Sequence, residues 1–473
     1  MPTLTDIRQR VRLERGAEAL RAQPPAAWVV AAVTTALYSV LSYSQWITLK
    51  SPSWDLGIFT ELAKAYSRFE APIVPIKGDG FNLLGDHFHP LLVLLGPVFA
   101  VFPSAFTLLI VQNVLIGVSA FVVTRAATRA LGRGPGALIG TSYALSWGLQ
   151  AAVDVQFHEI AFALPLLALS LEAILEQRWR AAALWAAPLV FVKEDLGLTV
   201  AFIGGYLVWK AGAKLGFALV GWGVGWLILA LVVILPLLNT GGHYAYGLST
   251  TEEFKPLGQA ILDFVLPSKR YETVGLLLLA CAGLALRSPL VLIMVPTLAW
   301  RFVSTNEGYW GPGWHYSAVL MPVLYLALVD AVRSGRVSRL PWMRSYAQAV
   351  PAVVVTVAIM LLPSQALGAL VKPETFTPPA RAEQAYEAMD VIPDGATVEA
   401  DIALMHYLVP DTTVFWLGNP GNPGAEYIIM DRTNGTWGGN APADAAVYAE
   451  QLHPGTNYTL VYSDSDYQVA ERQ

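Results

Sequence analysis

Long apolar stretches alternate with short polar segments over most of the chain, and this alternation stops near residue 372. A helix that crosses a bilayer needs about 20 mostly apolar residues, and about eleven stretches meet or approach this length. They lie at roughly 26–48, 104–123, 134–151, 160–176, 180–192, 196–209, 215–238, 273–286, 288–303, 316–332 and 345–366. The pattern predicts an all-α polytopic membrane bundle over residues 1–371.

The remaining residues carry a different pattern, in which prolines, acidic residues and short β-type runs replace the apolar stretches. The β-type runs are Ala396–Val398, Thr413–Trp416, Tyr427–Met430 and Tyr458–Tyr462. A helical pattern surrounds Ala380–Met389. Together these elements predict a small soluble α/β domain over residues 372–473, long enough for a modest core.

Composition supports a membrane protein. Of the 473 residues, 55% are hydrophobic and only 14% are charged, whereas soluble domains carry about 25% charged residues. The single cysteine, Cys281, excludes an intramolecular disulfide and a cysteine metal cluster. The net charge of -5 is small, and the basic residues cluster between apolar runs. We therefore expect the lipid bilayer as a partner and exclude nucleic acid.

Basic residues also predict the orientation. Five arginines precede the first apolar run, which lacks a small-residue cleavage site and is interpreted as a retained helix. They are Arg8, Arg10, Arg12, Arg15 and Arg21. Because cytoplasmic segments are enriched in Lys and Arg, the N-terminus is placed in the cytoplasm. With eleven spans, the C-terminal domain then faces the outside of the cytoplasmic (inner) membrane.

In this orientation, the main polar clusters all fall at the outer ends of predicted helices. Their members are Asp55, Asp86, His87, His89, Asp154, His158, Glu159, Lys193, Glu194, Asp195, His243, Arg301 and His315. Ionisable groups at the edge of the hydrocarbon core are costly, and they usually face a bundle interior or a wet cavity. The convergence predicts a shared outer cavity that performs the function.

Asp55 has two interpretations. It follows a Pro-Ser-Trp turn and could cap an amphipathic helix that runs to about Arg68, because aspartate accepts hydrogen bonds from free N–H groups. As a carboxylate beside a pocket, it could instead be the general base that deprotonates an acceptor hydroxyl. Glu61, two turns later, is interpreted as solvated or paired rather than catalytic.

The histidine motifs leave several alternatives open. His87 and His89 have a spacing that suits metal ligands, with Asp86 or Asp154 as an oxygen ligand. They could equally bind a phosphate or a sugar, or form only local loop contacts. In a helix, Asp154 and His158 would share one face and could form an Asp–His pair without a catalytic role.

The Lys193-Glu194-Asp195 sequence interrupts an otherwise apolar run, so it is either an internal salt bridge or a functional element. In the functional interpretation, Lys193 holds a phosphate while Glu194 or Asp195 orients it. His315, flanked by two aromatic residues, could bind a leaving phosphate or stack on a sugar. Arg301, at the end of the preceding predicted helix, could bind the phosphate as well.

Missing motifs exclude several enzyme classes. The chain has no Walker loop, no dinucleotide-binding glycine motif, no nucleophile elbow and no His-Glu-x-x-His zinc helix. ATPase, dehydrogenase, serine hydrolase and zincin functions therefore lack support.

The polar motifs resemble those of the membrane family called domain of unknown function 2079. The resemblance covers most of the chain, including the C-terminal domain. It rests on Trp54–Phe59, Gly85–Pro90, Asp154–Glu159, Lys193–Asp195, His315–Ala318 and Ile392–Val398.

That family is similar in layout to the GT-C glycosyltransferases, which take sugars from polyprenyl-phosphate donors outside the cytoplasmic membrane and carry an acidic residue in the first outer loop. The resemblance implies an inverting transfer in which Asp55, or otherwise Asp86, activates an acceptor hydroxyl. It also implies that Lys193, His315 and Arg301 hold the donor phosphate.

The expected function is thus sugar transfer from a polyprenyl-phosphate donor to a glycan, lipid or protein acceptor. No cofactor is required by the motifs, which leave room for a divalent cation. Two alternatives are a transporter or flippase of a lipid-linked sugar and a non-catalytic cell-envelope assembly protein. Transport sites usually lie near the middle of the membrane, whereas the ionisable groups here lie at outer helix ends, which favours the transferase.

Overall fold

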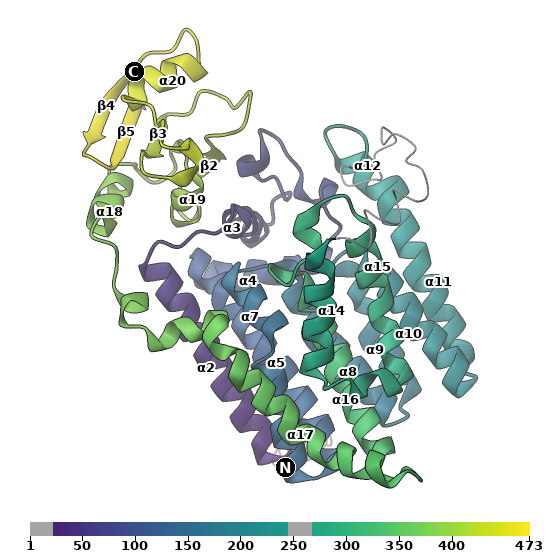
Figure 1. The fold of residues 1–473 in the computed structure, drawn as a ribbon. Coiled ribbons are helices and arrows are strands. Elements are labelled where there is room, and N and C mark those ends of the chain that lie inside the picture. Colours follow the sequence, from purple (N-terminus) through teal and green to yellow (C-terminus); the bar gives the residue numbers. More distant parts are fainter. Residues whose placement is uncertain (1–21, 245–266) are drawn as a thin grey trace, which may run out of the picture.

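The computed structural model describes residues 22–244 and 267–473, so the five N-terminal arginines lie outside the described residues. A bundle of helices forms most of the molecule, and a small domain with a β-sheet lies at one end of it (Figure 1). This arrangement agrees with the helical region and the C-terminal α/β region predicted from the sequence. The boundary at residue 372 stays a prediction.

Five helices in the described ranges are long and apolar enough to cross a membrane. They are centred on α2 (Pro25–Ile47), α5 (Ala105–Leu131), α11 (Lys214–Leu229), α16 (Leu320–Arg336) and α17 (Pro341–Leu361). Adjoining helical segments extend the last three of them to Lys214–Leu238, His315–Arg336 and Pro341–Ser364. Each corresponds to a predicted apolar stretch, while the total of about eleven spans stays a prediction.

Other predicted stretches form helices too short to span a membrane alone. They include α6 (Arg133–Ala144), α7 (Trp147–Asp154), α8 (Ala163–Leu175), α9 (Trp179–Ala186), α10 (Leu196–Ala211), α14 (Ser268–Ala280) and α15 (Val295–Val303). A further short helix, α4 (Leu95–Val101), lies outside these stretches and precedes α5. The stretch at 134–151 is divided at Leu145 and Ser146 into α6 and α7. After α9, Pro188 lies in a tight 3-10 turn (Ala187–Phe191), because proline cannot donate the helical hydrogen bond.

Glycines let α10 and α11 pack closely. A Cβ atom on Gly204 would lie 2.8 Å from the carbonyl oxygen of Gly216, and one on Gly197 would lie 2.6 Å from that of Gly223. Larger side chains at these positions would force the helices apart. In membranes, small residues at helix contacts allow the close approach on which van der Waals packing depends.

The centre of the bundle is formed by α5 and α16, with α2, α6 and α8 packed around them. At the end of the bundle far from the sheet, Arg125 of α5 donates from Nε to Glu172 of α8 at 2.7 Å. The Glu172 carboxylate is buried and also lies 3.5 Å from Arg129. Two cations thus compensate one buried carboxylate, which would be costly without a partner.

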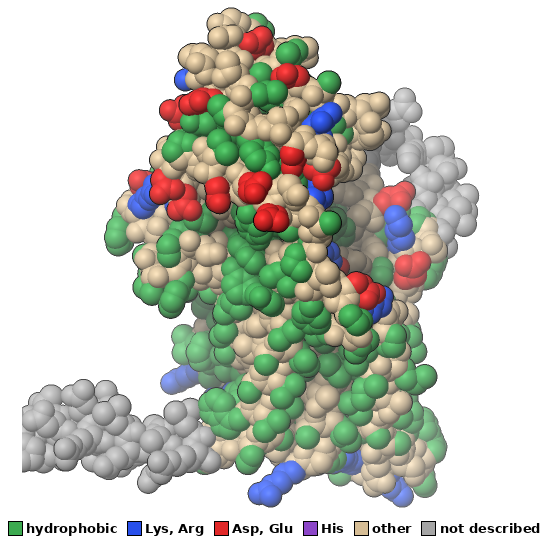
Figure 2. Space-filling view, turned by 90° about the vertical axis from the view of Figure 1, so that its left-hand side faces the viewer, with side chains coloured by type: hydrophobic (Ala, Val, Ile, Leu, Met, Phe, Trp, Pro, Cys, Tyr) green, Lys and Arg blue, Asp and Glu red, His purple; other side chains and the backbone are tan. Residues whose placement is uncertain are grey.

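The distribution of apolar and charged side chains on the surface indicates which part of the molecule contacts a bilayer. In Figure 2, hydrophobic side chains cover much of the bundle, Lys and Arg side chains gather at its lower end, and Asp and Glu side chains gather on the C-terminal domain. Large apolar side chains such as Leu184, Val232 and Leu237 are highly exposed. An exposed apolar belt of this kind is expected for a surface that contacts lipid tails.

The C-terminal domain contains a five-stranded sheet in the order β2-β1-β3-β5-β4. Its strands are β1 (Thr397–Ala400), β2 (Thr413–Trp416), β3 (Tyr427–Asp431), β4 (Tyr458–Ser463) and β5 (Tyr467–Arg472). The first three are parallel, and β5 pairs antiparallel with β3 and β4. Three helices, α18 (Ala382–Asp390), α19 (Ile402–Leu408) and α20 (Ala445–Leu452), complete the domain. The four predicted strands and the predicted helix are confirmed, and β5 is additional.

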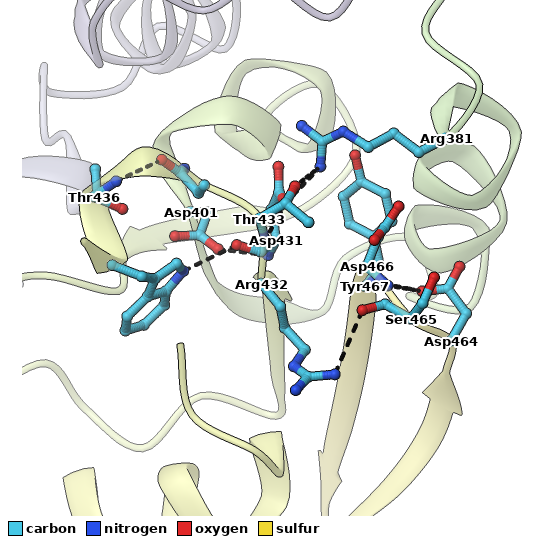
Figure 3. Close-up of polar contacts among 12 residues, drawn as sticks. Arg381, Asp401, Asp431, Arg432, Thr433, Thr436, Asp464, Ser465, Asp466 and Tyr467 are labelled. Atoms are coloured by element: carbon cyan, nitrogen blue, oxygen red, sulfur yellow. Dashed lines mark hydrogen bonds and ion pairs between the residues drawn. The ribbon is translucent and has the colours of Figure 1, made fainter. Parts of the chain in front are cut away.

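Polar contacts hold the carboxyl ends of β1 and β3 together (Figure 3). Asp401 accepts a hydrogen bond from the backbone N–H of Asp431 at 2.5 Å. Arg381 donates to the Asp431 carboxylate at 2.6 Å, and Thr433 donates to the same oxygen at 2.7 Å. Burial raises the pKa of Asp401 to about 7, although the Asp431 N–H favours its charged form. These contacts give the carboxylates of Asp401 and Asp431 partners within the domain.

The domain is fastened to α3 (Asp55–Ser67), the amphipathic helix after the first span. Buried Glu61 accepts hydrogen bonds from the backbone N–H groups of Ile76 at 3.2 Å and of Val414 in β2 at 3.3 Å. Lys64 donates to the carbonyl oxygens of Val409 and Thr412. The expected solvated or paired role of Glu61 is thereby refined, because its partners are backbone groups of two segments.

The raised pKa of Glu61 predicts that the stability of the folded protein depends on pH. Burial raises its pKa to about 8, although two N–H groups and Lys64 favour the charged form. The folded protein therefore keeps this proton to a higher pH than the unfolded chain, and Glu61 lowers stability progressively between about pH 4.5 and pH 8. We expect Glu61→Gln to flatten the fall of the melting temperature over this interval, as measured by thermal unfolding in lipid.

Exposed Glu70 supplies the control. Glu70→Gln should leave the pH dependence of the melting temperature as in the wild type. An unchanged slope in Glu61→Gln would show that Glu61 does not titrate in this interval.

Candidate functional site

Eight of the predicted residues meet at the end of the bundle next to the C-terminal domain, and we call this group the outer polar cluster. They are Asp55, His87, His89, His158, Glu159, Lys193, Glu194 and His315. They come from the start of α3, the segment before α4, the turn between α7 and α8, the turn before α10 and the turn before α16. The cluster joins segments that are far apart in the sequence.

Asp55 starts α3 but does not cap it, because its side chain makes no hydrogen bond to the helix N–H groups. Its Oδ2 atom accepts from the Ser53 hydroxyl at 2.6 Å and lies 3.6 Å from Nε2 of His158. Burial raises the pKa of Asp55, but His158, Ser53 and Lys193 together outweigh it and lower the pKa to about 2. Asp55 is therefore ionised at neutral pH, and its carboxylate does not change its protonation state between pH 5 and pH 7.

His158 connects Asp55 to a second imidazole. Its ring stacks on that of His315, with centroids 3.8 Å apart and an angle of 29° between the planes. Neither ring nitrogen of buried His315 has a hydrogen-bond partner in the described part of the chain, and Nδ1 of buried His89 also lacks one. Because buried polar atoms are normally hydrogen-bonded, these unpartnered nitrogens are candidates for hydrogen bonds to a ligand or to water.

Two buried carboxylates, those of Glu194 and Glu159, contact the remaining members of the cluster. Glu194 lies 2.7 Å from Nδ1 of His87 and accepts hydrogen bonds from the Phe88 N–H at 2.9 Å and the Tyr244 hydroxyl at 3.2 Å. Glu159 accepts from Lys193 at 2.7 Å. The structure thus contains the internal salt bridge that was one of the two interpretations of this sequence, and the partner of Lys193 is a carboxylate of another segment.

Asp195 lies beside these two residues but takes no part in their contacts. Its Oδ1 atom is buried and has no hydrogen-bond partner in the described ranges. Burial and the neighbouring Glu194 disfavour a second charge there. Lys193 and Glu159 already form the close ion pair of this turn.

The two remaining aspartates have their own partners. Asp86 lies 3.2 Å from Lys77, whose ammonium is 5.0 Å from the Trp54 ring. Asp154 forms an ion pair with Lys50 at 2.6 Å. The predicted Asp154–His158 pair is wrong, because α7 ends at Asp154 and the following turn directs His158 toward Asp55.

His243 and Arg301 lie apart from the cluster. His243 is exposed, and its Nδ1 lies 2.8 Å from the carbonyl oxygen of Gly241. Arg301 is fully buried and donates to the carbonyl oxygens of Tyr309 and Gly311 and to the Ser317 hydroxyl. Its direct contacts therefore hold the turn that carries His315.

The metal-ligand interpretation of His87 and His89 finds no support in the geometry. Within residues 22–244 and 267–473, no three His, Cys, Asp or Glu side chains are arranged to hold a metal ion. His87 contacts Glu194, while Asp86 and Asp154 contact lysines.

Two glutamines belong to the site but were not predicted. Gln112 of α5 accepts from the His158 N–H and donates to the carbonyl oxygen of Gln156. An amide inside an apolar stretch is a usable signal, because polar residues within membrane helices are costly and usually functional. The left-handed backbone of Gln156, with a φ of 70°, has no such signal in the sequence.

Comparison with known proteins supports the family resemblance seen in the sequence motifs. Residues 45–433 match the family model "Predicted membrane protein (DUF2079)", which confirms the resemblance carried by the motifs. No curated protein matches the chain. Two crystal structures of ArnT from Cupriavidus metallidurans, one bound to undecaprenyl phosphate and one in the apo state, have a similar fold.

Both ArnT structures align over 93% of this chain and 97% of the ArnT chain, at 13% sequence identity. The TM-scores are 0.54 for the complex and 0.50 for the apo state. At this identity, the likeness concerns the fold, and function depends on the site.

Proposed function

Because the chain belongs to the DUF2079 family of predicted membrane proteins and has an ArnT-like fold, we propose that it is a GT-C-type membrane glycosyltransferase. It transfers a sugar from a polyprenyl-phosphate donor to an acceptor hydroxyl on the extracytoplasmic side. The observation that carries this proposal is the ionised Asp55 carboxylate beside buried imidazoles with free nitrogens. The undecaprenyl phosphate bound to ArnT supports a donor of this class.

Asp55 is the proposed general base. Both of its contacts with described side chains involve Oδ2, which leaves Oδ1 to accept the proton of the acceptor hydroxyl. The acceptor oxygen then forms a bond with the anomeric carbon. The bond between that carbon and the donor phosphate breaks, and the electron pair leaves with the polyprenyl phosphate. Attack from the opposite face inverts the configuration. Asp86 is the second candidate for the base.

The donor phosphate is assigned to the free nitrogens of His315 and His89. Lys193 contributes positive charge near them, but Glu159 fixes its position. Arg301 acts through the turn that it holds rather than by direct contact. Burial lowers the pKa of His89 to about 4, so its ring is neutral near pH 7 and binds a phosphate oxygen through an N–H donor rather than through a positive charge.

The topology proposed here has eleven spans, a cytoplasmic N-terminus and an extracytoplasmic domain from about residue 372, in the inner membrane. Support comes from the Lys and Arg side chains at the end of the bundle opposite the C-terminal domain (Figure 2). In this topology the outer polar cluster lies on the extracytoplasmic side, where lipid-linked sugars are used as donors.

The direct test is a transfer assay with purified protein in lipid and a panel of polyprenyl-phosphate sugars. Consumption of one donor, with release of the polyprenyl phosphate, would support the proposal. Binding of a donor without consumption would instead favour transport or assembly, and transbilayer movement of that donor would then be measured. If no donor is bound or consumed, the proposed function is wrong.

A further inference from the structure

The turn that carries His158 is fixed by two glutamine side chains for which the proposed reaction has no direct use. Buried Gln112 accepts from the His158 N–H at 3.1 Å and donates to the Gln156 carbonyl oxygen at 3.0 Å. Gln156 in turn donates to the Lys50 carbonyl oxygen at 2.8 Å. Its left-handed backbone is unfavourable for a residue other than glycine, so these contacts keep the turn in a costly conformation.

That conformation determines where the His158 ring carries its proton. Nδ1 of His158 lies 3.2 Å from the Gln156 carbonyl oxygen, which can only accept a hydrogen bond. Nδ1 is therefore the protonated nitrogen. In a neutral ring, Nε2 would then present a lone pair to Oδ2 of Asp55 at 3.6 Å. Two acceptors facing each other repel, whereas a proton on Nε2 makes the contact an attractive ion pair.

The surroundings of His158 favour one positive charge on its ring. The His315 ring stacks on His158 with centroids 3.8 Å apart, so the two rings do not both carry a positive charge. The Phe59 ring packs edge-on against His158, with centroids 6.1 Å apart. The titratable groups that interact electrostatically with this ring are the carboxylates of Asp55 and Glu159 and the imidazole of His315, so negative charge predominates around it.

We infer that His158 is a positioning residue for the proposed base. As an imidazolium held by Gln112, it binds Oδ2 of Asp55 and keeps Oδ1 directed at the acceptor hydroxyl. This inference rests on the proposed function for its catalytic consequence, but the ionisation of His158 can be tested independently. Its prediction is that the rate falls on the alkaline side as the His158 ring loses its Nε2 proton.

The ionisation is tested first, by nitrogen NMR of the full chain in lipid with labelled histidine, using His158→Gln to assign the signal. At neutral pH, both nitrogens of His158 should be protonated in the wild type. In Asp55→Asn, the doubly protonated fraction should fall, because the carboxylate that stabilises it is gone. A singly protonated ring in the wild type would overturn the inference whatever the protein catalyses.

The kinetic test uses the donor that the wild type consumes. His158→Gln keeps an N–H donor but cannot titrate, so the alkaline fall in kcat should disappear while kcat drops about 10- to 100-fold. Gln112→Met keeps the side-chain volume and removes the amide. It should lower kcat by a similar factor without weakening donor binding. Gln451→Met, on an exposed position of α20, is the matched control.

The outcomes separate this inference from the proposed function. Wild-type consumption of a donor with an unchanged pH profile in His158→Gln would overturn the role of His158 and leave the glycosyltransferase standing. A loss that is equal at every pH would mean a purely structural role and would also overturn it. If one variant does not fold, the other variant and the NMR signal of the wild type still decide the matter.

Discussion

Replacing Asp55 with asparagine is expected to lower the rate of sugar transfer by about 100-fold or more. The amide has nearly the same shape as the carboxylate but cannot accept the proton of the acceptor hydroxyl. Donor binding should change little, because the free imidazole nitrogens assigned to the phosphate belong to other residues. The measurement is donor consumption by Asp55→Asn beside the wild type, together with donor affinity.

Two further aspartates make this result specific. Asp79 is exposed in the same outer segment as Asp86, and Asp79→Asn should leave the rate unchanged. Asp86→Asn tests the second candidate for the base. If Asp55→Asn is as active as the wild type while Asp86→Asn is inactive, then the base is Asp86, and the ion pair with Lys77 would have to open during the reaction.

The second large effect is expected at His315. His315→Phe retains an aromatic ring that can stack on His158 but removes both nitrogens. Hydrogen bonds to charged groups contribute about 1.5–3 kcal/mol, so donor affinity should fall about 10- to 100-fold. Binding of a polyprenyl-phosphate sugar to the protein in lipid, measured over a range of donor concentrations, gives this number.

His315→Gln provides the matched comparison, because an amide can restore one hydrogen bond to the phosphate. It should bind the donor more tightly than His315→Phe does. Equal donor affinity in the wild type and in His315→Phe would remove His315 from the phosphate site and leave His89 as the remaining free imidazole.

The helices could be predicted from the sequence where the length of an apolar stretch is sufficient to identify a membrane-spanning helix. The stretches at 26–48 and 104–123 correspond to α2 and α5, because a long apolar run has few alternatives in a bilayer. The stretch at 134–151 could not be resolved into α6 and α7, since the break at Ser146 depends on tertiary contacts rather than on hydropathy.

In the C-terminal domain, a short run of β-branched and aromatic residues was sufficient for β2, whose predicted and observed limits are the same. Strand β5 was missed because Gln468, Glu471 and Arg472 give it a polar composition. Its position between β3 and β4 buries residues 467–470. The sheet, rather than the local sequence, determines this strand.

For the site, the sequence identified residue types but not their partners. The clustering of His87, His158 and Lys193 followed from their positions at outer helix ends, and the structure brings them together. The pairing of His158 with Asp55 could not be foreseen. It depends on the turn at Gln156, whose backbone conformation carries no hydrophobic or charge signal.

The attachment of the C-terminal domain to α3 links two parts of the molecule mechanically. Glu61 and Lys64 hold the domain, and they belong to the same short helix whose first residue is Asp55. A rigid helix transmits displacement along its length, so a movement of the domain is also a movement of the carboxylate. A displacement of the domain would therefore reach Asp55 through α3 alone, without any change in the helices of the bundle.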